Sequence, residues 1–298
     1  MKTFGISPLI KMLILAFVAL VDLAQAQYYD YPPPQGPPPR QRRGERQEPA
    51  QLPLGEPSGY VSLNFGFVGI PQGNWASTTN MKYGSYGGYA TVGTSENISA
   101  GIPLNGTNFG VALMLGAYSN PVDMGSYTNN FGNSDSGRYN AANYYQPSGT
   151  SYNATVLMGG LFYTYPMGRF SLDFRGMIGI AFCGLPDIYF IGTYGGNQTD
   201  SWEVGGTNTT GFATDLGVGL RCVFRRNTCA MLNIDYTGIN TSYSTTMTHD
   251  YYYVPVSATS ANLTPWVANS NQIQVSGSLS MSLVTVSVGI GYQFGSVK

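Results

Sequence analysis

Few residues of this chain could do chemistry. Five charged residues are the first candidates, and they occur at every second position, or a multiple of two apart, within segments rich in apolar residues. The segment RFSLDFRGMIGIAFC contains Asp173 and Arg175, GFATDLGVGLRCVF contains Asp215 and Arg221, and the next segment contains Asp235. In each segment the charged residues share one face with small residues, while the other face is apolar. Opposite charges form strong hydrogen-bonded pairs where water is scarce. We therefore expect these five side chains to pair inside a narrow, closed space.

A catalytic site would depend on His249, the only histidine of the chain. Asp250 follows it directly, and Ser242, Ser244 and Thr248 precede it closely. Covalent catalysis needs a nucleophile with a base in reach, so these residues are the candidates for a lipid-modifying enzyme. We expect His249 to lie in a mobile loop rather than on a strand near a barrel rim. This placement argues against catalysis, and we assign no catalytic residue.

Metal, cofactor and nucleic-acid sites have little support. One histidine and three scattered cysteines give no metal-ligand spacing. The many glycines follow an alternating pattern and precede no helix, so a phosphate-binding loop is not indicated. The net charge of −1 gives no electrostatic case for nucleic acid. We expect no metal, no cofactor and no nucleic acid.

Two of the cysteines flank a short turn. Cys222 and Cys229 lie on either side of VFRRNT and could form a hairpin disulfide. The alternation places them on opposite faces, which argues against direct pairing unless a bulge intervenes. The sequence leaves the disulfide open.

The first 26 residues have the features of a secretory signal peptide. Lys2 and Lys11 accompany the apolar run MLILAFVALV, and AQA ends at Ala26. These features predict cleavage between Ala26 and Gln27. The apolar run is too short to suit the alternative of a membrane anchor.

A proline-rich tail is expected at residues 27–57, with the sequence QYYDYPPPQGPPPRQRRGERQEPAQLPLGEP. Such a composition favours extended, polyproline II conformations. Its basic residues Arg40, Arg42, Arg43 and Arg46 are candidates for docking to a periplasmic or peptidoglycan partner. The alternative is a solvated spacer.

From Gly59 onward, apolar and small or polar residues alternate with period two, which is typical of β-strands. We expect eight strands, namely Gly59–Ile70, Gly87–Pro103, Asn108–Ser119, Asn153–Tyr165, Arg169–Cys183, Gly211–Phe224, Cys229–Ser242 and Gln272–Phe294. The connections alternate between long and short, which is the asymmetry of outer-membrane barrels. Charged residues make up only 10% of the chain, which suits a membrane barrel but also a secreted β-sandwich.

The two faces of these strands indicate the solvent. One face is rich in Val, Leu, Ile and Phe, and the other carries glycine and single charges, as in a lipid-facing wall around a narrow lumen. We therefore predict an all-β fold at residues 58–298: an eight-stranded antiparallel up-and-down transmembrane β-barrel with long extracellular loops and short periplasmic turns. The even strand number places both barrel ends and the tail in the periplasm of a bacterial outer membrane.

Three stretches resemble the small outer-membrane β-barrel family of Bacteroidota, which is porin-like or OmpA-like. They are ISAGIPLNGTNFGVALMLGAYSNP, YTYPMGRFSLDFRGMIGIAF and the terminal VTVSVGIGYQF. The resemblance implies that Tyr292 and Phe294 form the assembly signal read by the barrel-insertion machinery. Here GSVK follows Phe294, so the aromatic residue is not the last one. These motifs carry no catalytic signature.

The interior of an eight-stranded barrel is just wide enough for side chains to fill. We therefore expect a non-enzymatic protein with a structural or surface-interaction role through its long loops, its tail, or both. Its partners are the lipid bilayer, the insertion machinery and, as a candidate, an envelope protein complex. Tyrosine-rich loop segments such as HDYYYVP suit recognition or anchoring at lipid headgroups. A narrow selective channel or ligand-uptake barrel is the alternative, and a lipid-modifying enzyme is the second alternative.

Overall fold

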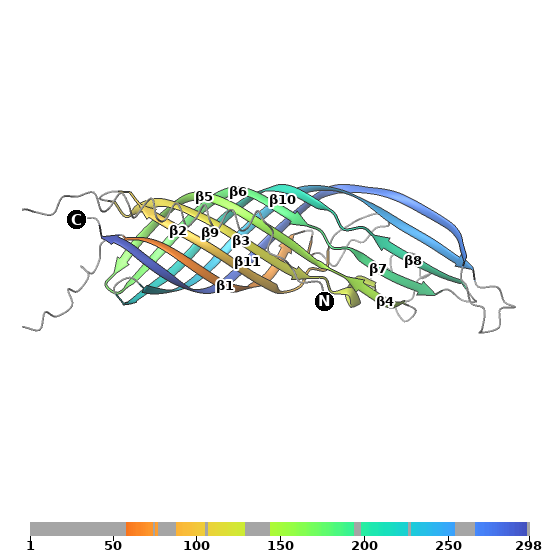
Figure 1. Ribbon diagram of the computed structural model, residues 1–298, viewed down its shortest axis with the longest axis horizontal. Coiled ribbons are helices and arrows are strands. Elements are labelled where there is room, and N and C mark those ends of the chain that lie inside the picture. The colour runs from red at the N-terminus through yellow and green to blue at the C-terminus, as the bar shows by residue number, and fades with distance from the viewer. Residues whose placement is uncertain are drawn as a thin grey trace, which may run out of the picture. The chain divides into compact units, whose positions relative to one another are not determined.

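Strand β11 (Trp266–Ser296) pairs with both β1 (Ser58–Gly73) and β10 (Thr228–Tyr253), which closes an antiparallel sheet into a ring (Figure 1). The computed structural model describes residues 58–73, 75–76, 88–104, 107–128, 144–193, 198–225, 228–253 and 266–296. Eight strands form the ring: β1 (Ser58–Gly73), β2 (Gly93–Pro103), β3 (Phe109–Pro121), β5 (Ser151–Met167), β6 (Phe170–Gly184), β9 (Asn208–Arg225), β10 (Thr228–Tyr253) and β11 (Trp266–Ser296). The predicted eight-stranded up-and-down barrel is confirmed.

The strands are staggered, so a path through directly paired residues climbs the barrel wall. One such path passes through Ile290, Leu63, Ile98, Leu115, Leu157, Ile180, Phe212, Asn240 and Ser280. It leaves β11 at Ile290 and returns to β11 at Ser280, ten residues earlier. A stagger of ten in eight strands gives a strand tilt of about 40°, within the usual range for barrels. Side chains can fill a ring of this width.

Three further strands extend the sheet at the end of the barrel where the long connections lie. They are β4 (Tyr144–Gly149), β7 (Ile188–Thr193) and β8 (Gln198–Val204). The far half of β10 continues beyond β9 and pairs with β8, and β7 and β4 follow in turn. Sequence analysis expected loops in these regions, and this expectation is wrong for all three strands. It is also wrong for parts of β10 and β11. Strand β10 continues to Tyr253 instead of ending at Ser242, and β11 begins at Trp266 instead of Gln272.

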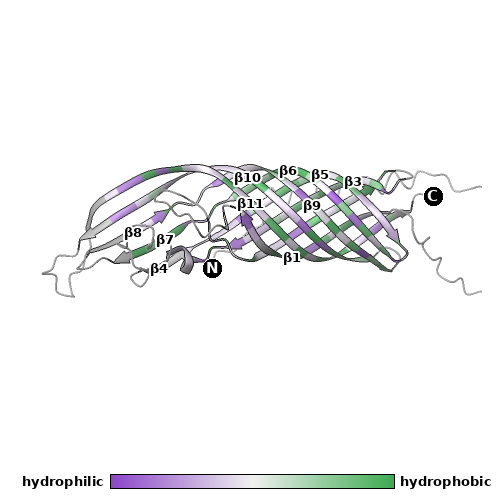
Figure 2. Ribbon diagram, turned by 180° about the vertical axis from the view of Figure 1, so that it is seen from behind, coloured by the Kyte–Doolittle hydropathy of each residue, from purple (hydrophilic) through white to green (hydrophobic). Residues whose placement is uncertain are grey.

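Hydrophobic and hydrophilic residues alternate along the ring strands (Figure 2). Along β10, the polarity of the outward-facing and inward-facing residues changes from one end to the other. Near the short turns, the exposed outer residues of β10 are apolar: Leu232, Ile234 and Tyr236. Farther along, the exposed outer residues are polar: Asn240, Ser242 and Ser244. The inner, buried positions are polar at Asn233, Asp235 and Thr237, and farther along the large apolar residues Ile239, Tyr243 and Met247 alternate with threonine. The first part therefore suits lipid around a polar interior, and the second suits water around an apolar core.

Aromatic side chains build the apolar core at the long-loop end. Trp75 meets Tyr152 edge to face at 5.3 Å, and Tyr127 meets Phe190 in the same way at 5.9 Å. Tyr127 belongs to a helical turn at residues 124–128. Hydrogen bonds from the side chain and backbone of Ser126 to the Asp123 carboxylate cap this turn and lower the pKa of Asp123. The core thus joins connections that are far apart in the sequence.

Candidate functional site

An ion pair blocks the interior near the short-turn end. Arg221 on β9 meets Asp173 on β6, with 3.2 Å between Nη2 and Oδ1. The Thr164 hydroxyl donates to the same carboxylate oxygen at 2.6 Å, and Arg221 Nη1 donates to the Ser58 carbonyl at 3.3 Å. The guanidinium also lies over the Tyr60 ring, 4.8 Å from its centroid. Together these side chains reach from β6 and β9 across the lumen to β1.

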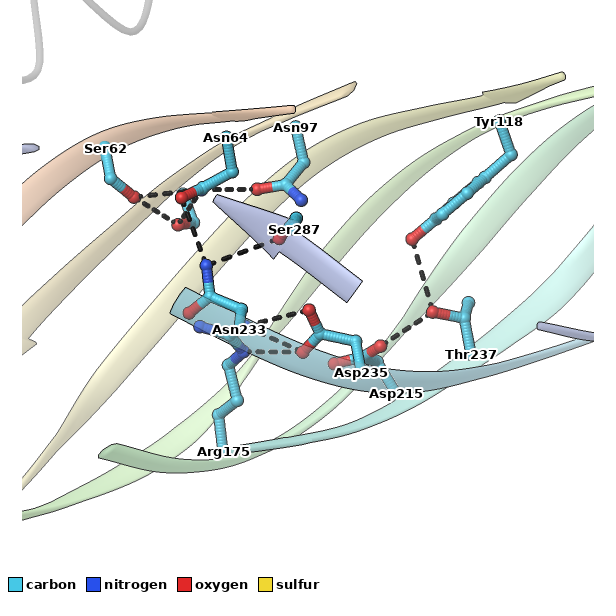
Figure 3. A network of polar contacts seen from close by, with 11 residues as sticks. Ser62, Asn64, Asn97, Tyr118, Arg175, Asp215, Asn233, Asp235, Thr237 and Ser287 are labelled. Carbon is cyan, nitrogen blue, oxygen red and sulfur yellow. Dashed lines mark hydrogen bonds and ion pairs between the residues drawn. The ribbon is translucent and has the colours of Figure 1, made fainter. Parts of the chain in front are cut away.

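A second ion pair lies deeper in the barrel and crosses a strand (Figure 3). Arg175 Nη2 donates to both carboxylate oxygens of Asp235 at 2.7 and 2.9 Å, and Nε donates to Oδ1 at 3.0 Å. Arg175 lies on β6 and Asp235 on β10, and both pair in register with Gly217 of the strand between them. A Cβ at Gly217 would overlap Asp235 Oδ1 and come within 2.6 Å of Arg175 Nε. The pair therefore needs a residue without a side chain at position 217.

We expect Gly217→Ala to lower the free energy of unfolding by about 1–3 kcal/mol, because overpacking would displace the buried pair. Urea unfolding in lipid, followed by tryptophan fluorescence, measures the change. Gly176→Ala is the matched control, since its Cβ would meet only Leu216 Cδ2, at an ordinary 3.6 Å. Equal effects of the two substitutions would contradict this account of position 217.

An uncharged polar layer lies in the lumen beside the Arg175–Asp235 pair. Its members are linked by hydrogen bonds in Figure 3, and they are Ser62, Asn64, Asn97, Ser99, Asn233 and Ser287. Asn64 links β2 to β10 along one side of the lumen, because it donates to Asn97 Oδ1 at 2.7 Å and accepts from Asn233 at 3.1 Å. Sequence analysis did not select these residues. The alternation in GYVSLNFGF, which places Ser62 and Asn64 on the face opposite Leu63 and Phe65, was the available signal.

Asp215 is the third carboxylate of the lumen group and belongs to neither ion pair. It accepts from the Thr237 hydroxyl at 2.7 Å, and Thr237 is 3.2 Å from the Tyr118 hydroxyl. Figure 3 shows Asp215 beside Asp235. The lumen group thus contains three carboxylates and two guanidinium groups. All five side chains belong to residues exposed by 6% or less, so the group is buried in the barrel interior.

The structure corrects the expected position of His249. It lies on β10 rather than in a loop, only 1% exposed, and its ring stacks on Trp202 with centroids 3.5 Å apart. The alternation of β10 directs Ser242, Ser244 and Thr248 to the opposite, outer face. A buried imidazole with these hydroxyls on the other side of the sheet cannot serve them as a base. The geometry therefore gives a packing role for His249.

The three cysteines are free and form no disulfide with one another. In the register, Cys222 pairs with Ala230, while Cys229 pairs with Val223. Cys229 is buried and Cys222 is half-buried. The adjacent strand positions thus keep the two thiols on different faces.

The remaining sequence-predicted residues lie at the chain ends. Tyr292 is 48% exposed on the outer wall, and Phe294 pairs in register with Gly59 of β1. Ala26, Gln27 and the arginines of the tail at positions 40, 42, 43 and 46 lie outside the described residues. Within the described ranges, no group of three or more His, Cys, Asp or Glu residues could hold a metal ion. No helix in the same ranges is long and apolar enough to cross a membrane.

Comparisons with known proteins return only distant structural matches. No family model and no curated protein matches the sequence. Neisserial surface protein A is 11% identical, with 79% of this chain and 97% of that chain covered and a TM-score of 0.41. A major outer membrane protein of Thermus thermophilus is 11% identical, with 80% and 100% covered and a TM-score of 0.39. The attachment invasion locus protein of Yersinia pestis is 12% identical, with 80% and 99% covered and a TM-score of 0.33. None of these similarities assigns a role to a residue of this chain.

Proposed function

We propose that the chain is a non-enzymatic outer-membrane barrel that acts through its long-loop end, its N-terminal tail, or both, and not through its lumen. The buried network of ion pairs and hydrogen bonds in the lumen is the observation that supports the proposal. Two ion pairs and a hydrogen-bonded amide layer lie in the lumen, and their side chains are buried. A solute would have to break these interactions to pass. The long-loop end then faces the outside of the cell, and the short turns and the tail lie in the periplasm.

The long-loop end supplies a rigid surface for recognition. The apolar core holds β8 against β10, and the outer side chains of β11 in this part are exposed amides and hydroxyls: Gln272, Gln274, Ser276 and Ser278. Polar side chains on a rigid strand can form hydrogen bonds at a low entropic cost. We propose that this surface, or the arginines of the tail, contacts a partner in the envelope or outside the cell. The assignment to barrels of Bacteroidota belongs to the same proposal.

A pull-down in gentle detergent from the native outer membrane tests the binding role. We compare the intact protein with a variant lacking residues 28–57 and with a variant in which Gln272, Gln274 and Ser276 are alanine. A stoichiometric partner lost with one variant and kept with the other identifies the binding surface. Recovery of the barrel alone would contradict membership of an envelope complex and would direct the search to ligands outside the cell.

Planar-bilayer conductance tests the closed lumen, and with it the alternative of a narrow channel. We expect no stable single-channel steps from the purified barrel, because the ion pairs occupy the path. Stable conductance steps would contradict the proposal and favour a channel. Such a channel should prefer cations, because the lumen contains one more carboxylate than guanidinium groups. Circular dichroism of the same sample controls for folding.

A further inference from the structure

The outer wall of the barrel carries an open groove at the border where the apolar belt ends. Its lining comes from the ends of β5, β6 and β9 toward the long connections, and its volume is about 670 Å³, within the usual range of small-molecule sites. The lining residues are Asn153, Thr155, Phe182, Cys183, Gly184, Asn208, Thr209 and Thr210. No charged side chain is among them.

The register of the three strands explains the shape of the groove. Gly184 pairs with Asn153 on one side and Asn208 on the other. Because Gly184 has no side chain, a notch opens between the two amides. A Cβ built at Gly184 would lie 3.4 Å from Asn208 Oδ1 and 3.8 Å from the Asn153 Cβ. The position is therefore able to accept a side chain, and glycine there leaves an open space between hydrogen-bonding groups.

The next row toward the short turns adds an aromatic surface. Phe182 is 45% exposed and pairs with Thr155 and Thr210 on its two sides. The row below it consists of the lipid-facing residues Leu157, Ile180 and Phe212. Amides and hydroxyls thus lie directly above a purely apolar wall.

We propose that this groove binds the sugar headgroup of a glycolipid in the outer leaflet. Amides and hydroxyls donate and accept hydrogen bonds, as the hydroxyl groups of a sugar require. The exposed Phe182 ring offers a surface for the C–H face of a sugar ring, and the apolar row beneath it contacts the acyl chains. A phosphate headgroup would favour arginine or lysine in the lining, and the groove has neither. The proposal rests on the outer-membrane placement proposed above, but it is independent of the closed lumen.

The test compares two substitutions on the same face of the same strand. Gly184→Val fills the notch, and Gly176→Val, eight residues away on β6 and among lipid-facing residues, is the matched control. A β-branched residue suits a strand at both positions. The full-length barrels are placed in nanodiscs with phospholipid and titrated with a phosphate-free glycolipid, monoglucosyl diacylglycerol, and native mass spectrometry counts the bound glycolipid. We expect Gly184→Val to weaken binding about five- to tenfold, as for the loss of about one hydrogen bond, with Gly176→Val unchanged.

Asn208→Ala and Asn153→Ala each provide a second, independent measurement, with a smaller decrease in the same direction. The sugar part of the glycolipid without acyl chains should not compete at equal concentration, since the proposed site uses both parts. Equal binding by wild type and Gly184→Val, or no binding by either barrel in correctly inserted nanodiscs, would overturn the proposal. These outcomes leave the pull-down and conductance results untouched. Failure of the proposed function is therefore recognised separately.

Discussion

Replacing Arg175 with glutamine should lower the free energy of unfolding of the barrel by about 3–5 kcal/mol, because it leaves a buried carboxylate without its partner. The effect should be large here because Arg175 donates three buried hydrogen bonds to the Asp235 carboxylate. Urea unfolding in lipid and the temperature at which the folded band disappears on gels both measure the change.

The double variant Arg175→Gln/Asp235→Asn should recover a large part of this loss. With both charges of the pair removed, the two amides can bond to each other across Gly217, and a single carboxylate, Asp215, remains with Thr237. Replacing both members of a buried ion pair is often close to neutral, whereas removing one is not. The comparison includes Asp235→Asn alone. If the loss of stability in the double variant equals the sum of the losses in the two single variants, the pair contributes no coupling and its proposed role is contradicted.

The sequence predicts the lumen residues but not which of them pair. Asp173 and Arg175 are two residues apart on one strand and look like natural partners. In the structure each of them pairs with a residue on another strand, Asp173 with Arg221 and Arg175 with Asp235. The choice depends on the register of three strands and on the space above Gly217, and neither can be read from alternation alone.

The eight ring strands were predictable because lipid on one face and the lumen on the other impose a strict alternation of apolar and small or polar residues. The short turns that join β2 to β3, β5 to β6 and β9 to β10 also mark where these strands end. The far part of β10 was missed because its outer face is serine and threonine rather than leucine and valine. Segments such as TSYSTTMTH read as loops, although threonine and tyrosine favour strands. Tyr243, Met247 and His249 point inward and alternate with outward polar residues, so the period of two continues into this part of β10. If water surrounds this part, its larger apolar residues face inward, which is the reverse of the pattern in the lipid-facing part. His249 was misplaced for this reason.

The reversal of polarity along β10 leads to a second large effect. We expect Ile234→Arg to destabilise the barrel by about 2–4 kcal/mol, the cost of an arginine on the lipid face near the middle of a bilayer. Ile234 is 54% exposed on the outer wall, between Val218 of β9 and Val286 of β11. A charged guanidinium at this position would lie against acyl chains, and its side chain would have to extend toward the headgroups. Unfolding in phospholipid vesicles measures the difference.

Ser244→Arg is the control, because Ser244 lies on the same strand and the same outer face, ten residues farther along, and is exposed beyond the apolar belt. If this part of β10 is surrounded by water, the arginine is solvated there and the stability should change by less than about 0.5 kcal/mol. In detergent-free water the folded barrel should aggregate through its belt whichever residue occupies position 244. A similar loss at both positions would mean that lipid covers the whole length of β10. In that case, the apolar core at the long-loop end would need another explanation than burial away from water.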